Sequence, residues 1–357
     1  MSSSSLRTLA PVSRPAAGQR SPLRLAAWTS LVLLALAAPF GFGGYGLYVA
    51  ASGGLMAVGA MALTVLSGSA GLPSLGTAAF LAIGAFSSGI LATQMGLGIL
   101  PAIGVAIVLG FASGAGVALL TLRVSGLYLA VGTLALQHVV SIVATDLDLK
   151  LTYASGFMLD SPHLFGIAID SPWRWWALTV ALIAVVLMLF AWLQRGHVGR
   201  EWALLRAEPT AAAALGISAV RARLTVFALT SAVIAASGAV DGYRLGNVQA
   251  TGYTLHLAVT YLTVVALGGA GRLIGAIVAS YVVVMLPDAI AALLRVAGID
   301  ATSRLAGIDN MLLGSILVFA LLDGPARVRG ALLRRRGPAA IPATEPATTA
   351  DRNGSDA

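Results

Sequence analysis

The sequence contains no cysteine and a single lysine, Lys150. The lack of cysteine excludes disulfides, thiolate metal sites and cysteine nucleophiles. Because Lys150 is followed by Leu151, the chain cannot form the G-x-x-x-x-G-K-[ST] loop that cradles nucleotide phosphates. The protein therefore does not bind ATP through such a loop.

Patterns typical of catalytic and metal sites are missing as well. The 4 histidines do not have the spacing of metal ligands, and neither H-E-x-x-H nor G-x-S-x-G occurs. We therefore expect no catalytic residue, no metal and no other cofactor on this chain, and we predict that it is not an enzyme. The high pI of 10.4 comes from arginines that flank apolar segments, so we attribute it to membrane topology and expect no nucleic-acid partner.

Charge of either sign is scarce. Charged residues make up 10% of the chain and hydrophobic residues 58%, whereas soluble domains are about 25% charged. Apolar segments near the ~20 residues that a helix needs to cross a bilayer recur along the chain. The alternation typical of a transmembrane barrel does not appear. The sequence therefore predicts an all-α, polytopic transmembrane bundle in a lipid bilayer.

We expect three parts along the chain. Residues 1–25, rich in Ser, Pro and Arg, predict a disordered basic arm, and residues 323–357, rich in Pro, Ala and Thr, predict a disordered tail. Residues 26–322 form the predicted transmembrane domain. About ten spans are expected within it, at 26–42, 49–67, 74–94, 100–121, 125–145, 173–193, 223–241, 254–268, 273–290 and 308–322.

The arginines indicate the orientation of these spans. Loops on the cytoplasmic side of membrane proteins carry an excess of Lys and Arg. With the N-terminus inside, ten spans place most of the 22 basic residues on the cytoplasmic side, including those of a polar loop at 195–223. We therefore expect both termini to be cytoplasmic.

Polar side chains interrupt one predicted span, SGLYLAVGTLALQHVVSIV. We select Tyr128, Thr133, Gln137 and His138 as candidate residues of a translocation path. Thr133 and Gln137 are four residues apart and share one helix face. Because buried polar groups in hydrocarbon need partners, two interpretations remain open: interhelical hydrogen bonds, or the lining of a hydrated path.

Ionisable residues are nearly absent from the interiors of the predicted spans. Asp241, Asp288 and Asp309 fall at predicted span ends, where they are expected to face water. Ion-coupled carriers commonly bind their ion near the membrane midplane. The pattern therefore counts against a carrier energised through its own side chains, but a stand-alone secondary carrier or channel remains an alternative.

Two glycine-rich segments interrupt the apolar pattern at membrane depth, residues 66–77 (LSGSAGLPSLGT) and 267–275 (LGGAGRLIG). Irregular backbone at that depth must be buried in protein or line a cavity. For 267–275, which Arg272 anchors to the cytoplasmic face, we predict a tight turn. For 66–77 a turn and a re-entrant segment remain open. The outer connection 146–172 is either a simple connector or a functional surface.

The polar loop at 195–223 contains a helix signal. Pro209 suits the first position of a helix, Ala211 to Ala214 favour its interior, and Gly216 suits the position just past its end. The predicted helix of roughly seven residues is shorter than the ~12–15 needed for even marginal stability alone. It must therefore be held by the membrane domain or by the groove of a partner.

Several blocks together resemble one family, the permease subunits of bacterial ATP-binding-cassette (ABC) importers for branched-chain amino acids, of the LivM type. The resemblance covers residues 40–322, and its most specific block is the polar loop with the span that follows. The blocks are LSGSAGLPSLGTAAFLAIGAF, TLRVSGLYLAVGTLAL, LTYASGF, GREWALLRAEPTAAAALGISAVRARLTVFALTSAVIAASGAV and YLTVVALGGAGRLIGAIVASYVVVMLPDAI.

The resemblance implies a bacterial plasma-membrane subunit that forms half of a pore. Its expected partners are a second permease subunit in a heterodimer, two cytosolic ATP-binding subunits and an extracytoplasmic solute-binding protein. The loop would carry the coupling helix that seats in the ATP-binding subunit. The positions carried over for this loop are Gly199, Arg200, Arg206, Ala207, Glu208, Ala211, Ala212 and Ala213, with Leu215 and Gly216 ending the helix. The transported solute cannot be read from the residues.

Overall fold

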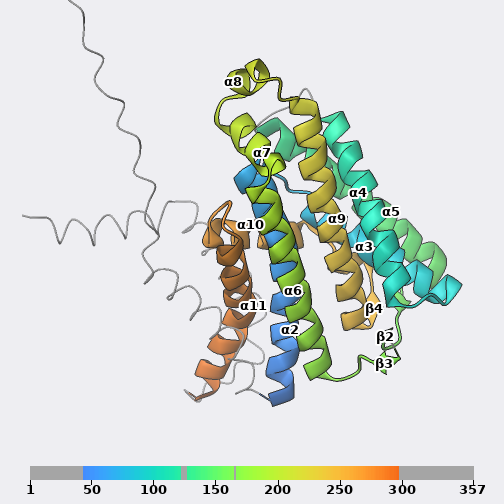
Figure 1. Ribbon diagram of the computed structural model, residues 1–357. Helices are drawn as coiled ribbons and strands as arrows, with labels where there is room; N and C mark the ends of the chain where they lie inside the picture. Colours follow the sequence, from blue (N-terminus) through green and yellow to red (C-terminus); the bar gives the residue numbers. More distant parts are fainter. Residues whose placement is uncertain (1–42, 122–126, 165, 297–357) are drawn as a thin grey trace, which may run out of the picture.

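The computed structural model describes residues 43–121, 127–164 and 166–296 (Figure 1). The predicted spans 26–42 and 308–322, the basic arm at 1–25 and the tail at 323–357 lie outside these residues. The total of ten spans and the side of the two termini therefore stay predictions.

The described part of the chain contains seven helices that are long and apolar enough to cross a membrane. A further apolar helix, α11, covers residues 273–296 and has a shorter apolar part, Leu273–Asp288. The multi-span helical class predicted from the sequence is confirmed for this part. The long helices are α2 (Gly43–Thr64, continued by the π-helix η2, Val65–Ser69), α3 (Thr77–Met95), α4 (Ile99–Leu120), α5 (Leu127–Thr152), α6 (Pro172–Arg195), α9 (Ala219–Leu245) and α10 (Leu255–Gly268), which the 3-10 helix η3 (Ala250–Gly252) precedes.

Helix ends follow local sequence signals. Pro172 occupies the first turn of α6, where a missing N–H is no loss. The Ser218 hydroxyl caps α9 by accepting a hydrogen bond from the backbone N–H of Arg221. Gly246, with a left-handed φ of 69°, ends the same helix. Helix α9 thus extends four residues past its predicted end. Helix α5 also extends seven residues past its predicted end.

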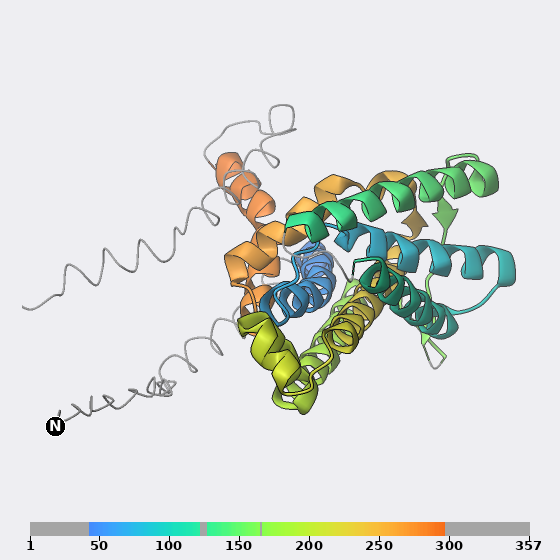
Figure 2. The same ribbon diagram turned by 90° about the horizontal axis from the view of Figure 1, so that it is seen from above.

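Helix α2 occupies the centre of the bundle. Its apolar window is 83% buried, whereas the corresponding windows of α4, α5 and α6 are each 28% buried. It packs against α6, α9, α10 and α11, and it lies among the other helices when the molecule is viewed from above (Figure 2). The three less buried helices therefore supply most of the surface that faces lipid or another subunit.

Glycines allow α9 to approach α3 closely. A Cβ at Gly84 would lie 1.8 Å from the carbonyl oxygen of Ala235, and a Cβ at Gly238 would lie 2.2 Å from that of Leu81. Only glycine fits at either point, so the two backbones touch, as is typical of packed membrane helices. This contact places the core of the bundle between α2, α3 and α9.

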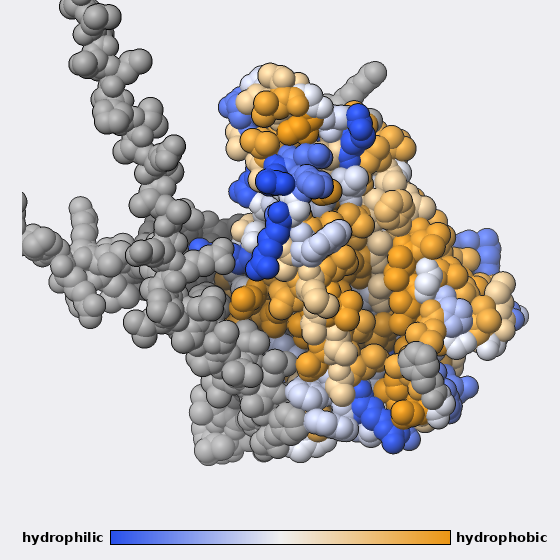
Figure 3. Space-filling model, in the orientation of Figure 1, coloured by the Kyte–Doolittle hydropathy of each residue, from blue (hydrophilic) through white to orange (hydrophobic). Residues whose placement is uncertain are grey.

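The two ends of the bundle differ in structure. Two short helices, α7 (His197–Ala207) and α8 (Pro209–Ala214), lie at one end, and the strands lie at the other (Figure 1). Apolar residues cover the middle of the visible face and hydrophilic residues gather towards both ends (Figure 3). The strands, which we did not predict, are β1 (Phe157–Met158), paired antiparallel with β4 (Asn247–Val248), and β2 (His163–Leu164), paired antiparallel with β3 (Ile167–Ala168).

Candidate functional site

The polar loop folds into the helices α7 and α8. The predicted short helix is confirmed as α8: Pro209 is its first residue, and Gly216, with a φ of +77°, follows its end. Its length is 6 residues, close to the predicted seven. Helix α7, of 11 residues, was missed. The apolar spacing of Val198, Trp202 and Leu205 was the available signal for it.

Trp202 anchors α7 to the transmembrane helices. Its side chain is 1% exposed, and its indole Nε1–H donates a hydrogen bond to Thr225 Oγ1 of α9, at 3.3 Å. Just before α7, the Gln194 amide Nε2 donates to Ser69 Oγ at 3.0 Å, where η2 ends. Helix α7 is therefore fixed both to α9 and to the end of the central helix.

Arg206 adds a contact between α7 and the same helix end. Its guanidinium Nη1 donates a hydrogen bond to the carbonyl oxygen of Gly68 in η2. A cation near the last carbonyls of a helix is favourable because those oxygens lack intrahelical partners. An open cavity of about 410 Å³ lies beside this contact, between α7 and η2. Helix α7 is thus joined by a side-chain hydrogen bond to the end of the helix that α2 and η2 form.

The two glycine-rich segments meet next to Arg206. A Cβ at Gly68 would lie 1.8 Å from the backbone nitrogen of Gly271, so the segments touch through their backbones. Residues 267–275 form the predicted tight turn between α10 and α11. Residues 70–76 are a non-helical connection from η2 to α3 in which Leu72 and Ser74 are buried. This arrangement favours the turn for 66–77 over a re-entrant helix.

Most of the positions carried over for coupling are exposed. These are Arg200, Arg206, Ala207, Glu208, Ala211, Ala213, Leu215 and Gly216. Gly199 is buried, and a Cβ there would lie 2.5 Å from the Cα of Gln194. Ala212 has no exposed surface and packs inward in this structure, and its role in coupling stays a prediction. One face of α8 must pack inward because so short a helix has no stability of its own.

The candidate path residues divide between two faces of α5. Thr133 and Gln137 are buried: Thr133 Oγ1 accepts a hydrogen bond from Leu75 N at 2.9 Å, and Gln137 Nε2 donates to the Tyr253 carbonyl at 2.9 Å. These bonds favour the interpretation of the pair as partners in hydrogen bonds between segments. Tyr128 and His138 are exposed on the outside of the helix. The four residues therefore do not share one face of α5, and their role in translocation stays a prediction.

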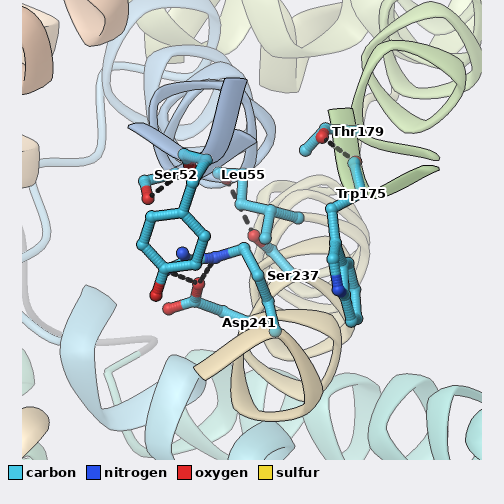
Figure 4. Close-up of polar contacts among 8 residues, drawn as sticks. Ser52, Leu55, Trp175, Thr179, Ser237 and Asp241 are labelled. Carbon is cyan, nitrogen blue, oxygen red and sulfur yellow. Dashed lines mark hydrogen bonds and ion pairs between the residues drawn. The ribbon is translucent and has the colours of Figure 1, made fainter. Parts of the chain in front are cut away.

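A polar contact that the sequence did not reveal lies between α2 and α9. Arg244 and Asp241 form an ion pair of 2.9 Å, and Arg244 lies over the ring of Tyr48, 4.9 Å from its centroid. Figure 4 shows Asp241 beside Ser237, whose hydroxyl donates to the Leu55 carbonyl of α2 at 2.9 Å. The expectation that Asp241 simply faces water at a span end is wrong, because α9 continues past it to Leu245.

A second missed residue, Asp148, connects three segments at the strand end of the bundle. Its carboxylate accepts hydrogen bonds from the Thr152 hydroxyl at 2.6 Å and from the backbone N–H groups of Gly156 and Ala250, each at 3.1 Å. The side chain is buried. Asp148 therefore fixes the end of α5 to the segments that carry β1 and η3.

These features define a class: a multi-pass membrane protein with a helical loop at one end of its bundle. Within the described ranges, no group of three or more His, Cys, Asp or Glu side chains could hold a metal ion. The family described as "Branched-chain amino acid transport system / permease component" matches residues 45–321, so the chain belongs to this family. The predicted family is thereby confirmed, and the chain is a multi-pass transport protein of the plasma membrane.

Two curated relatives carry the same description, "High-affinity branched-chain amino acid transport system permease protein LivM". The protein of Escherichia coli (strain K12) is 29% identical over 280 residues, and that of Salmonella typhimurium (strain LT2) is 29% identical over 281 residues. The alignments cover 72% of this chain and 66% of each relative. The chain thus matches just under two thirds of the length of these relatives. No solved structure is significantly similar to it.

Proposed function

We propose that the chain is a permease subunit of an ABC importer and forms half of the translocation pathway for branched-chain or related amino acids or small polar solutes. A second permease subunit, two cytosolic ATP-binding subunits and an extracytoplasmic solute-binding protein complete the complex. Membership of the permease family supports this role. The two relatives named for a branched-chain amino acid transport system support the substrate class.

The loop 195–223 is the input from the ATP-binding subunits in this proposal. The exposed face of α8, with Ala211, Ala213 and Leu215, seats in a groove of the ATP-binding subunit. A short helix in a groove is a recurrent mode of recognition. Helix α7 then passes the movement to the spans. The single observation that carries the proposal is the Arg206 hydrogen bond to Gly68, since it joins the loop to the most buried helix.

The charge distribution supports a cytoplasmic position for this loop. Arg195, Arg200, Arg206, Arg221 and Arg223 all belong to it, at the α7–α8 end of the bundle. Lys and Arg gather near span ends on the cytoplasmic side. With α8 inside, the strands and Asp148 lie on the outer side, where the solute-binding protein docks. Ten spans with both termini cytoplasmic fit the same orientation.

The proposal is tested by placing a charge on the exposed face of α8. Ala213→Arg should prevent recovery of the ATP-binding subunits with the detergent-solubilised permease and should lower ATP-dependent uptake at least tenfold, because a buried unpaired charge at an interface is strongly unfavourable. Membrane abundance should stay the same. Ala219→Arg is the matched control, since Ala219 is exposed in the same loop but begins α9.

Two outcomes would contradict the proposal. One is normal uptake and normal co-purification in Ala213→Arg. The other is solute uptake by this chain alone in proteoliposomes driven by an ion gradient, which would favour a stand-alone secondary carrier.

A further inference from the structure

A charged pair lies near the C-terminal end of α9, next to β4 at the strand end of the bundle. Arg244 and Asp241 are one helical turn apart, and the side chain of Arg244 is 5% exposed, whereas that of Asp241 is 30% exposed. Removing a guanidinium from water is costly, and full hydrogen bonding is needed to offset the cost. A cation in the last turn of a helix is favourable, but a buried guanidinium still needs a hydrogen-bond partner for each of its nitrogens.

The hydrogen bonding of Arg244 is incomplete. Its Nε and Nη2 both approach the same oxygen, Asp241 Oδ1, at 2.9 Å. Its third nitrogen, Nη1, is buried and has no hydrogen-bond partner among the residues described. One buried, charged donor is thus left over while the carboxylate of the pair stays partly accessible.

Tyrosines surround the pair. The ring of Tyr48 lies under the guanidinium, at 4.9 Å from its centroid. Tyr253 and Tyr261 lie close enough to interact electrostatically with both charges. Within the described ranges the buried hydroxyl of Tyr253 also lacks a hydrogen-bond partner. Two unpaired buried polar groups therefore lie near one accessible carboxylate.

We propose that Asp241 and Arg244 form a binding subsite for the zwitterionic head group of an α-amino acid. The ligand carboxylate accepts a hydrogen bond from Arg244 Nη1, and the ligand ammonium donates to the Asp241 carboxylate. The tyrosines enclose the head group, with the Tyr253 hydroxyl as an added polar contact. The assignment of the ligand to amino acids rests on the proposed importer function.

Charge complementarity supports this ligand class. The protein pair and an α-amino acid each carry one positive and one negative charge, so the four charges together sum to zero. Charge-assisted hydrogen bonds are strong where water is excluded. A ligand with a single charge leaves one member of the protein pair uncompensated. The subsite therefore selects for molecules that carry both groups, whatever their side chain.

The test measures weak binding directly, by saturation-transfer difference NMR on the assembled importer in lipid nanodiscs, without ATP and without the solute-binding protein. The probes are L-leucine and L-alanine. Wild type should give saturation transfer to both. Two analogues of leucine each lack one of the two charged groups: 4-methylpentanoate has no ammonium, and 3-methylbutylamine has no carboxylate. Each should give at least tenfold less saturation transfer than leucine.

Variants test whether the saturation transfer depends on Asp241 and Arg244. Arg244→Gln and Asp241→Asn should each weaken leucine binding at least tenfold. Tyr253→Phe should weaken it severalfold with an unchanged melting temperature, because that hydroxyl has no hydrogen-bond partner among the described residues. This variant keeps the proposal testable if the charge variants fail to fold. Arg174→Gln is the matched control, since Arg174 forms an exposed ion pair of 2.8 Å with Asp170.

The subsite and the importer function are contradicted by different results. Three results would overturn the subsite. The first is no signal for either amino acid in wild type, and the second is signals from the single-charge analogues equal to that of leucine. The third is leucine binding by folded Arg244→Gln equal to that of wild type. ATP-dependent uptake by wild type in these experiments would leave the importer function intact. Absence of such uptake would instead contradict the importer function.

Discussion

Helices α7 and α8 lie next to each other in one loop but are held in different ways. Helix α7 has a fully buried anchor, Trp202, and two side-chain hydrogen bonds to the spans, from Trp202 and Arg206. In α8 Ala212 is the one buried residue, and the rest of the helix is exposed. A segment that transmits movement must be rigidly attached, whereas a segment that docks must present its surface. The difference fits the proposed function, in which α7 transmits movement and α8 docks.

Among substitutions that test the difference between α7 and α8, Trp202→Ala should have the largest effect on stability and uptake. Removing a fully buried Trp costs about 3–5 kcal/mol, and the hydrogen bond to Thr225 is lost with it. Helix α7 should detach, the unfolding free energy should fall by that amount, and uptake should be abolished. A thermal melt of the purified protein with an uptake assay checks this. Trp192→Ala, an exposed Trp on α6, is the control and should change stability far less. Equal melting curves for the two variants would show that α7 is not anchored as described.

An intermediate effect is expected from Arg206→Gln. A hydrogen bond to a charged group contributes about 1.5–3 kcal/mol, and this one joins α7 to Gly68. Because α8 is untouched, the ATP-binding subunits should still co-purify, but uptake per ATP hydrolysed should fall severalfold. Arg200→Gln, at an exposed position of the same helix, should keep the wild-type ratio. A fall in uptake that is matched by an equal loss of co-purification would place Arg206 in docking and not in transmission.

The sequence predicts α8 well and α7 poorly, for physical reasons. Pro209 and Gly216 act through backbone geometry, which is local and readable. Helix α7 exists because Trp202 is buried against α9, and that contact joins residues distant in sequence. The inward face of α8 was not readable either, because six residues of mostly alanine have no distinct apolar face. The burial of Ala212 therefore could not be predicted from the sequence.

Within the spans, residue spacing predicted which side chains share a helix face, but it did not predict which face packs against the other helices. Thr133 and Gln137 share a face of α5, as four-residue spacing requires, and both are buried. Tyr128 and His138 point outward, which depends on which side of α5 packs on its neighbours. Arg244 lies beyond residue 241, where the sequence predicted this span to end. The helix continues to Leu245, and Arg244 is buried in its last turn.

The smallest effect on stability is expected from Leu215→Ser, at the end of α8. The side chain is 70% exposed, and surface substitutions usually change the unfolding free energy by no more than about 0.5 kcal/mol. Removing an apolar contact from a docked helix should nevertheless weaken recovery of the ATP-binding subunits about tenfold. Quantitative co-purification beside a melting curve measures both. Docking by α8 requires that these two quantities separate, with stability kept and partner binding lost. Loss of both together would mean that Leu215 belongs to the packed part of the loop, and the division between a transmitting α7 and a docking α8 would fail.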